Sequence, residues 1–73
     1  MEWFNPKDKL PMDHQMVLIL TTNVRYPEVA ELEKYDGFEE WYIFANDDVE
    51  KTENVLMWSP IELPERGIII KQK

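Results

Sequence analysis

The sequence has no cysteine, only two glycines and no long hydrophobic run. Without cysteine, neither a disulfide framework nor a thiolate metal site can form. Glycines at positions 37 and 67 alone are too few for a glycine-rich phosphate-binding loop. The longest apolar run, at 16–20, is far shorter than the roughly 20 residues that cross a bilayer, and the N-terminal residues lack the apolar core of a signal peptide. We therefore expect a cytoplasmic protein with no membrane contact.

What the sequence does contain indicates a folded chain. Of its 73 residues, 44% are hydrophobic and nine are aromatic, which is too many for a disordered tail. This length suits a single small domain over residues 1–73, with a core that buries only about 60% of the surface exposed by the unfolded chain. Trp41 and Trp58 each follow or end an apolar run, so we expect both indoles to be largely buried.

Short segments rich in β-branched and aromatic residues alternate with turn residues, and they predict strands at 16–22, 29–35, 38–45 and 54–58. Pro6 and Pro11 bracket an irregular N-terminal arm, and the acidic segment from Asn46 is expected to be a solvated turn. The predicted fold is mainly β: an antiparallel meander of three to five short strands, with the arm and the Trp58 segment covering one face. The alternative is a small α+β fold, because residues 27–34 include good helix formers after a proline.

The dipeptide Asp36-Gly37 is the strongest local signal and predicts a two-residue type I′ hairpin. This turn would pair Tyr35 with Phe38, and by subtraction Glu33 with Glu40. Leu32 and Ala30 would then share one face with Trp41 and Ile43, whereas carboxylates and aromatic rings would share the other. Because two opposed glutamates repel each other, a longer Gly-Phe-Glu loop with a different register remains an alternative.

The order of tryptophans and prolines carries a resemblance. The landmarks are Trp3, Leu10-Pro11, Val17-Leu18, Tyr35-x-Gly37, Trp41 and Val55-x-x-Trp58-x-Pro60-Ile61. This order resembles a small domain family of unknown function found mostly in phages and prophages, whose members close on V-x-H-W-M-P-L-P. Here Met57 stands at the histidine position, two extra residues delay the second proline, and residues 66–73 have no counterpart. The resemblance implies a compact β-rich fold and a phage-related origin, but no activity.

Residue types that commonly carry out catalysis are scarce in this sequence. The single histidine, His14, lies in a polar turn, and the single serine, Ser59, has no G-x-S-x-G motif around it. The acidic segment at 46–53 lacks the glycine and the final glutamate that an EF-hand loop requires. We therefore predict a protein that is not an enzyme and that has no catalytic residue, metal or cofactor.

The charge is unevenly distributed. The chain has a net charge of −7, and between residues 28 and 53 ten acidic residues meet two basic ones, a balance of −8. Such a field repels nucleic acid and attracts basic surfaces over about 8 Å at physiological salt. In the predicted register, Tyr35, Phe38, Tyr42 and Phe44 share a face with Glu31, Glu33 and Glu40, and aromatic residues rimmed by charge are typical of binding patches.

These features predict a non-enzymatic acidic interaction module, for which the resemblance implies a phage origin. Its partner would be a protein with a basic surface, and it would not bind nucleic acid directly. The residues expected to contact the partner are Glu31, Glu33, Glu39, Glu40, Tyr42, Asp47, Asp48 and Glu50. A sharper version is an inhibitor that imitates the phosphate rows of a nucleic acid to block a nucleic-acid-binding protein. The alternative is an accessory or structural phage domain whose acidity serves solubility only.

The C-terminal segment 67–71 combines a glycine, three isoleucines and a lysine, which predicts a further strand. We expect it to pair within the chain, because exposed isoleucines would form an aggregation-prone edge. The alternative is a homodimer formed by strand addition through residues 67–71, so the sequence leaves monomer and homodimer open.

Overall fold

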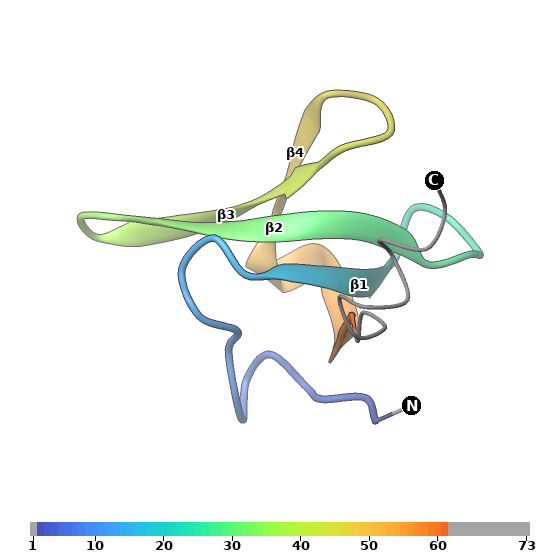
Figure 1. Cartoon of the computed structure of the whole chain (residues 1–73), viewed down its shortest axis with the longest axis horizontal. Coiled ribbons are helices and arrows are strands. Elements are labelled where there is room, and N and C mark those ends of the chain that lie inside the picture. Colours follow the sequence, from blue (N-terminus) through green and yellow to red (C-terminus); the bar gives the residue numbers. More distant parts are fainter. Residues whose placement is uncertain (1, 62–73) are drawn as a thin grey trace, which may run out of the picture.

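A computed structural model describes residues 2–61, which form one antiparallel five-stranded sheet (Figure 1). Its elements are β1 (Met16–Thr21), β2 (Glu28–Tyr35), β3 (Phe38–Ile43), β4 (Asp48–Lys51), the 3-10 turn η1 (Thr52–Asn54) and β5 (Val55–Pro60). The strand order is β4-β3-β2-β1-β5, so four strands form a meander and β5 returns to pair with β1. The predicted mainly β, antiparallel fold is confirmed, and the helical alternative for 27–34 is wrong.

The hairpin of β2 and β3 has the predicted register. Tyr35 pairs with Phe38 and Glu33 with Glu40, so the longer loop is excluded. The predicted type I′ turn is wrong, because within the described residues only Gly37 of this turn has a positive φ, of 93°. A type I′ turn needs positive φ at both central residues. Strand β3 ends at Ile43, two residues earlier than predicted.

Strand β4 corrects the prediction of an acidic turn over residues 46–50. The turn lies at residues 44–47, and Asp47 has a φ of 54° there. From Asp48 onward the chain pairs with β3, so that Val49 lies opposite Tyr42 and Glu50 opposite Trp41. This segment has little β propensity of its own, and pairing with the neighbouring strand decides its conformation.

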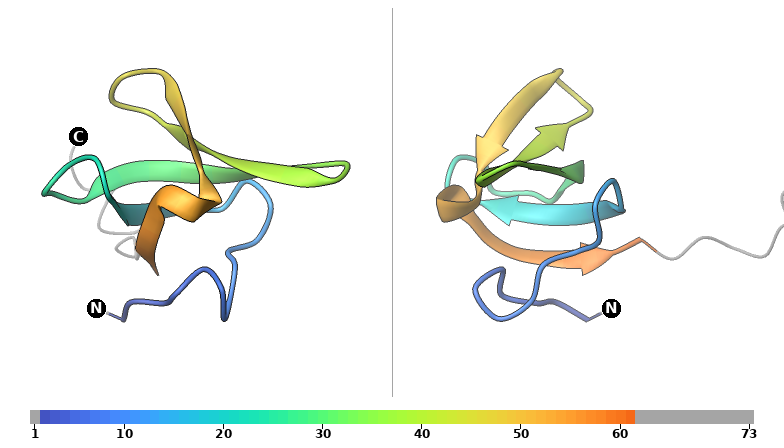
Figure 2. Two further views of the ribbon diagram at one scale, coloured as in Figure 1. Left: turned by 180° about the vertical axis from the view of Figure 1, so that it is seen from behind. Right: turned by 90° about the vertical axis from the view of Figure 1, so that its left-hand side faces the viewer.

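The N-terminal arm and the Trp58 segment occupy different positions relative to the sheet. The Trp58 segment does not cover the sheet: it is strand β5, with Trp58 opposite Ile19. The arm lies along β5, as the views in Figure 2 show, and the backbone groups of Phe4 and Trp58 exchange two hydrogen bonds of 2.8 and 2.9 Å. The Trp58 indole N–H donates to the Lys9 carbonyl at 2.8 Å, which holds the arm over the core.

One face of the sheet carries the core. Its buried apolar residues are Val17, Ile19, Ala30, Leu32, Trp41, Ile43, Val55 and Trp58, with Phe4 and Leu10 of the arm packed against them. Trp41 is 0% exposed and Trp58 2%, which confirms the predicted burial. The Trp41 indole N–H donates to Thr52 Oγ1 at 2.9 Å, so the η1 segment closes over this face.

The predicted strand at 67–71 lies outside the described residues. Within 2–61, no helix is long and apolar enough to cross a membrane.

Candidate interaction surface

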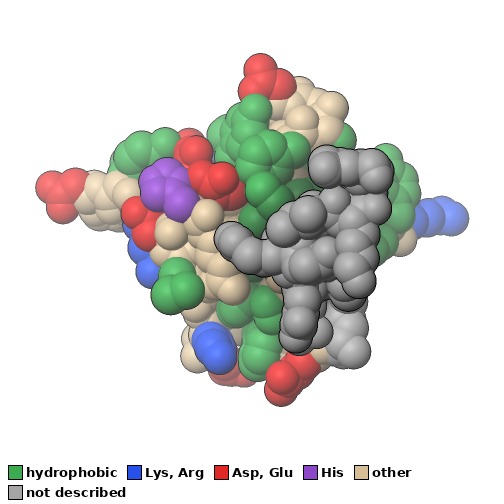
Figure 3. All heavy atoms as spheres, in the orientation of Figure 1, with side chains coloured by type: hydrophobic (Ala, Val, Ile, Leu, Met, Phe, Trp, Pro, Cys, Tyr) green, Lys and Arg blue, Asp and Glu red, His purple; other side chains and the backbone are tan. Residues whose placement is uncertain are grey.

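The face of the β2–β3 hairpin opposite the core carries acidic and aromatic side chains. Successive side chains of a strand point to opposite faces, so the burial of Leu32 and Trp41 turns their neighbours outward. We call these outward residues the hairpin face: Glu31, Glu33, Tyr35, Phe38, Glu40 and Tyr42. Figure 3 shows the acidic and hydrophobic side chains that gather around the histidine on this side of the molecule.

Aromatic rings stand among the carboxylates of the hairpin face. The rings of Tyr35 and Phe38 stack with centroids 4.8 Å apart, and they are 48% and 56% exposed. The Tyr35 hydroxyl donates to Glu33 Oε1 at 2.9 Å and the Tyr42 hydroxyl to Asp47 Oδ1 at 2.5 Å. These hydrogen bonds to carboxylates raise the pKa of both phenols, so the tyrosines remain neutral at physiological pH.

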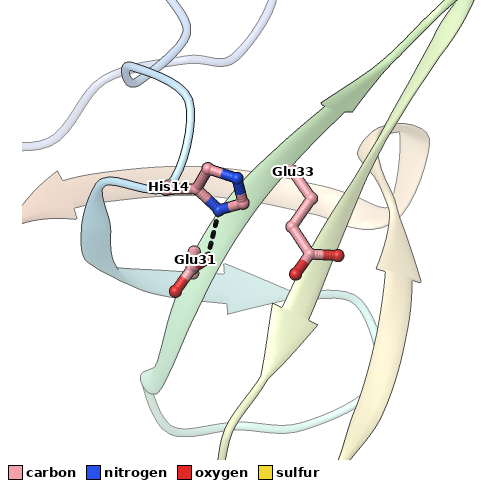
Figure 4. Close-up of side chains that lie close together, drawn as sticks. All are labelled: His14, Glu31 and Glu33. Atoms are coloured by element: carbon pink, nitrogen blue, oxygen red, sulfur yellow. Dashed lines mark hydrogen bonds and ion pairs between the residues drawn. The ribbon is translucent and has the colours of Figure 1, made fainter.

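His14 is fixed at the border of the hairpin face by the turn that precedes β1. Its backbone, with a φ of 65°, donates to the Leu32 carbonyl at 2.7 Å, and Asp13 Oδ1 accepts from the backbone N–H of Lys34 at 2.9 Å. The imidazole Nδ1–H donates to Glu31 Oε2 at 2.5 Å (Figure 4). This hydrogen bond, with the nearby charge of Asp13, raises the pKa of His14 above its usual 6.5 and favours the imidazolium.

Three side chains at this border offer possible metal ligands. Donor atoms of His14, Glu31 and Glu33 lie within 4.8 Å of one another, and they belong to the ligand types taken by zinc and manganese (Figure 4). The sequence indicates only a polar turn around His14 and carries no local signal for this group. All three side chains already make hydrogen bonds within the protein, because His14 donates to Glu31 and Glu33 accepts from Tyr35.

The hairpin face brings together half of the predicted contact residues. Glu31, Glu33, Glu40 and Tyr42 lie on it in adjoining register positions. Asp47 follows in the β3–β4 turn and joins the group through its hydrogen bond with Tyr42.

The other three predicted contact residues lie on the core side of the sheet. Glu39 accepts a hydrogen bond from Thr52 Oγ1 at 3.3 Å, and Glu50 accepts from Asn23 and Asn54, each at 2.7 Å. Asp48, opposite the buried Ile43, accepts at 2.8 Å from the backbone N–H of its neighbour Val49. Glu39 and Glu50 therefore brace loops, and their position separates them from the hairpin face.

The carboxylates of the hairpin face have little positive charge near them. Within residues 2–61 the only ion pairs are those of His14, with Glu31 and with Asp13. Glu33 and Glu40 lie opposite each other, and Lys51, which is the cross-strand neighbour of Glu40, makes no ion pair with it. A cationic ligand would therefore meet carboxylates of which Glu31 is paired with His14, whereas Glu33 and Glu40 make no ion pair within the described residues.

A hollow of about 670 Å³ opens at one end of the hairpin face, and no pattern in the sequence predicted it. We call it the end pocket, and its lining residues are Tyr26, Pro27, Glu28, Val29, Phe44, Ala45 and Asn46. It forms where the loop before β2 and the turn after β3 diverge. Its aromatic and aliphatic side chains are accessible: Tyr26 is 62% exposed, Phe44 40% and Val29 38%.

Comparisons with protein-family models, with curated proteins and with solved structures find no match to this chain. The resemblance to a phage-associated family therefore stays a prediction.

Proposed function

We propose that this protein is a non-enzymatic interaction module that binds a protein partner with a basic surface through the hairpin face. The observation that supports this most is the half-buried group Glu31, Glu33 and Glu40, which lies opposite the core and makes no ion pair with a described lysine or arginine. Such a group attracts cationic surfaces and speeds their association. The same charge repels nucleic acid, so the proposed partner is a protein.

The aromatic side chains add apolar contact area to the charged surface. Charge alone steers a partner but contributes little affinity, whereas partly exposed aromatic rings supply contact area at small entropic cost. Tyr35 and Phe38 are already stacked on each other, so their rings are held in place before a partner arrives. We therefore expect the partner's cationic groups to lie over the carboxylates and its apolar parts to contact the rings.

A narrower proposal is a phage-derived inhibitor that imitates nucleic acid. Alternate strand positions such as those of Glu31 and Glu33 repeat every ~6.7 Å along the backbone, and oxygens of these two carboxylates lie within 4.8 Å of each other, so they form a short row of negative charges. A nucleic-acid-binding protein would be the target. The competing proposal is an accessory or structural phage domain whose acidity only maintains solubility.

Affinity capture from a bacterial lysate at two salt concentrations tests these proposals. The baits are the unmodified protein, a hairpin variant (Glu31→Gln, Glu33→Gln, Glu40→Gln) and a control variant with the same net charge. The control carries Glu2→Gln, Asp8→Asn and Glu53→Gln, three exposed acidic residues that lie outside the hairpin face. We expect a basic protein to be retained by the unmodified protein and the control, but lost at high salt and from the hairpin variant.

Other capture results would point elsewhere. Displacement of the captured protein by added DNA would support the imitation of nucleic acid. Equal retention by the two variants would contradict the hairpin face as the binding surface. The absence of any specific partner would favour the accessory role.

A further inference from the structure

The end pocket and the hairpin face form one continuous surface. Val29 lies two residues before Glu31 on β2, so both side chains project from the same side. Phe44 lies in the turn directly after β3, and its backbone N–H donates to the Val29 carbonyl at 3.2 Å. The Phe44 ring meets the Tyr42 ring edge-on, with centroids 5.0 Å apart. Along β2 an apolar position is thus followed by two acidic positions and an aromatic one, which at strand spacing covers about 20 Å.

The end pocket is suited to an apolar side chain. Its volume of about 670 Å³ falls within the range of small-molecule sites, and it easily admits one leucine or aromatic side chain. Tyr26, Val29 and Phe44 offer it exposed apolar surface that loses contact with water when the pocket is filled.

The charge around the pocket identifies the occupant. Glu28 is part of the lining, and Glu31 is the next outward residue after Val29. A second copy of the chain would bring a further net charge of −7 against these carboxylates, which opposes self-association through this surface. A cationic segment meets the opposite situation, because its charges complement the row of glutamates that begins at the pocket.

We propose that the end pocket receives an aliphatic or aromatic side chain of a partner segment whose following alternate residues are lysine or arginine. In an extended segment, alternate residues have the same spacing as the outward residues of β2. The apolar anchor then enters the pocket while the two basic side chains lie over Glu31 and Glu33. This inference rests on the proposed function and adds the sequence pattern that the partner presents.

Two synthetic peptides of equal length and charge test the inference. One has the order Leu-Thr-Lys-Thr-Lys-Thr, and in the other serine replaces the leucine. NMR titration of the unmodified protein should give an affinity about tenfold higher for the leucine peptide, since burial of one leucine side chain corresponds to at least this ratio. In Phe44→Ser the preference should shrink to about twofold or less, while the serine peptide binds as before.

A second pocket variant keeps the test independent of folding. Phe44 and Tyr26 both lie outside the buried core, so Phe44→Ser and Tyr26→Ser should each retain the circular dichroism spectrum of the unmodified protein. Both variants should lose the preference for leucine. A preference that persists in both would overturn the inference, because the pocket would not be the site of the leucine.

The remaining outcomes separate this inference from the proposed function. Equal, salt-sensitive binding of both peptides would overturn the pocket assignment and leave the acidic surface standing. No binding of either peptide would count against both. A leucine preference that appears only after removal of residues 65–73 would assign the pocket to the chain's own C-terminal segment. A dimer that dissociates on Phe44→Ser would assign it to a second copy.

Discussion

Replacement of Trp58 by alanine should remove a large part of the stability of the protein. The indole is 2% exposed, packs against the Phe4 ring at 5.0 Å between centroids, and donates to the Lys9 carbonyl. Truncation of a buried tryptophan to alanine costs about 3–5 kcal/mol. A domain of 73 residues has a total stability of about 4–11 kcal/mol, so Trp58→Ala should lose from about a third of this stability to all of it.

Two further variants help to interpret this loss of stability, one that separates the hydrogen bond from the ring and one that serves as a control. Trp58→Phe keeps an aromatic ring beside Phe4 but removes the donor to Lys9, so we expect a loss of about 1–3 kcal/mol. Leu56→Ala lies on the same strand but is 51% exposed, so its effect should stay within about 0.5 kcal/mol.

Urea unfolding followed by circular dichroism measures these differences without depending on tryptophan fluorescence. With a slope of about 1 kcal/mol per molar urea, the Trp58→Ala midpoint should fall by about 3 M or more. A Trp58→Ala midpoint close to that of the unmodified protein, at an unchanged slope, would refute the assignment of Trp58 to the core.

The remaining predictions concern single contacts. Gly37→Ala should lower stability by about 1–2 kcal/mol in thermal melts, because residue 37 has a positive φ that alanine adopts at a cost. The cost comes from the backbone alone, since a Cβ there would meet no atom within 4 Å, and an unchanged melting temperature would refute it. Thr52→Val should lower stability by about 1–3 kcal/mol, because it leaves the Trp41 indole N–H without its acceptor. Thr52→Ser keeps the hydroxyl acceptor and should retain the stability of the unmodified protein. The pKa of His14, measured by NMR, should exceed 6.5 and fall in Glu31→Gln. Because folding raises this pKa, the contribution of His14 to stability is present below about pH 6.5 and is lost as the pH rises through the folded-state pKa. Parallel stability curves for the unmodified protein and His14→Asn across that pH range would contradict this.

The hairpin could be predicted because its determinants are local. Asp36-Gly37 and the alternation of residues in the flanking strands were enough to place Leu32 opposite Trp41. The same register also placed Glu39 on the core side, so its inclusion among the partner contacts disregarded a signal that the sequence contained. The turn type was not predicted correctly, since tolerance of positive φ at Asp36 does not require that conformation.

Features that depend on distant residues could not be read from the sequence. The bond from His14 to Glu31 joins residues 17 apart, and that from Asn23 to Glu50 joins residues 27 apart. Neither pair forms a local pattern. Strand β4 was missed because the acidic residues at its start resemble a turn, and only its pairing with β3 makes them extended.

The central claim is that the hairpin face is the surface that meets a basic partner. Titration of a lysine-rich peptide into the protein, followed through the carbon NMR signals of the glutamate carboxyl groups, tests this claim most directly. We predict salt-sensitive shifts at Glu31, Glu33 and Glu40, with little change at Glu39 and Glu50 on the core side. Shifts of equal size on both sides of the sheet, or shifts confined to the core side, would contradict it.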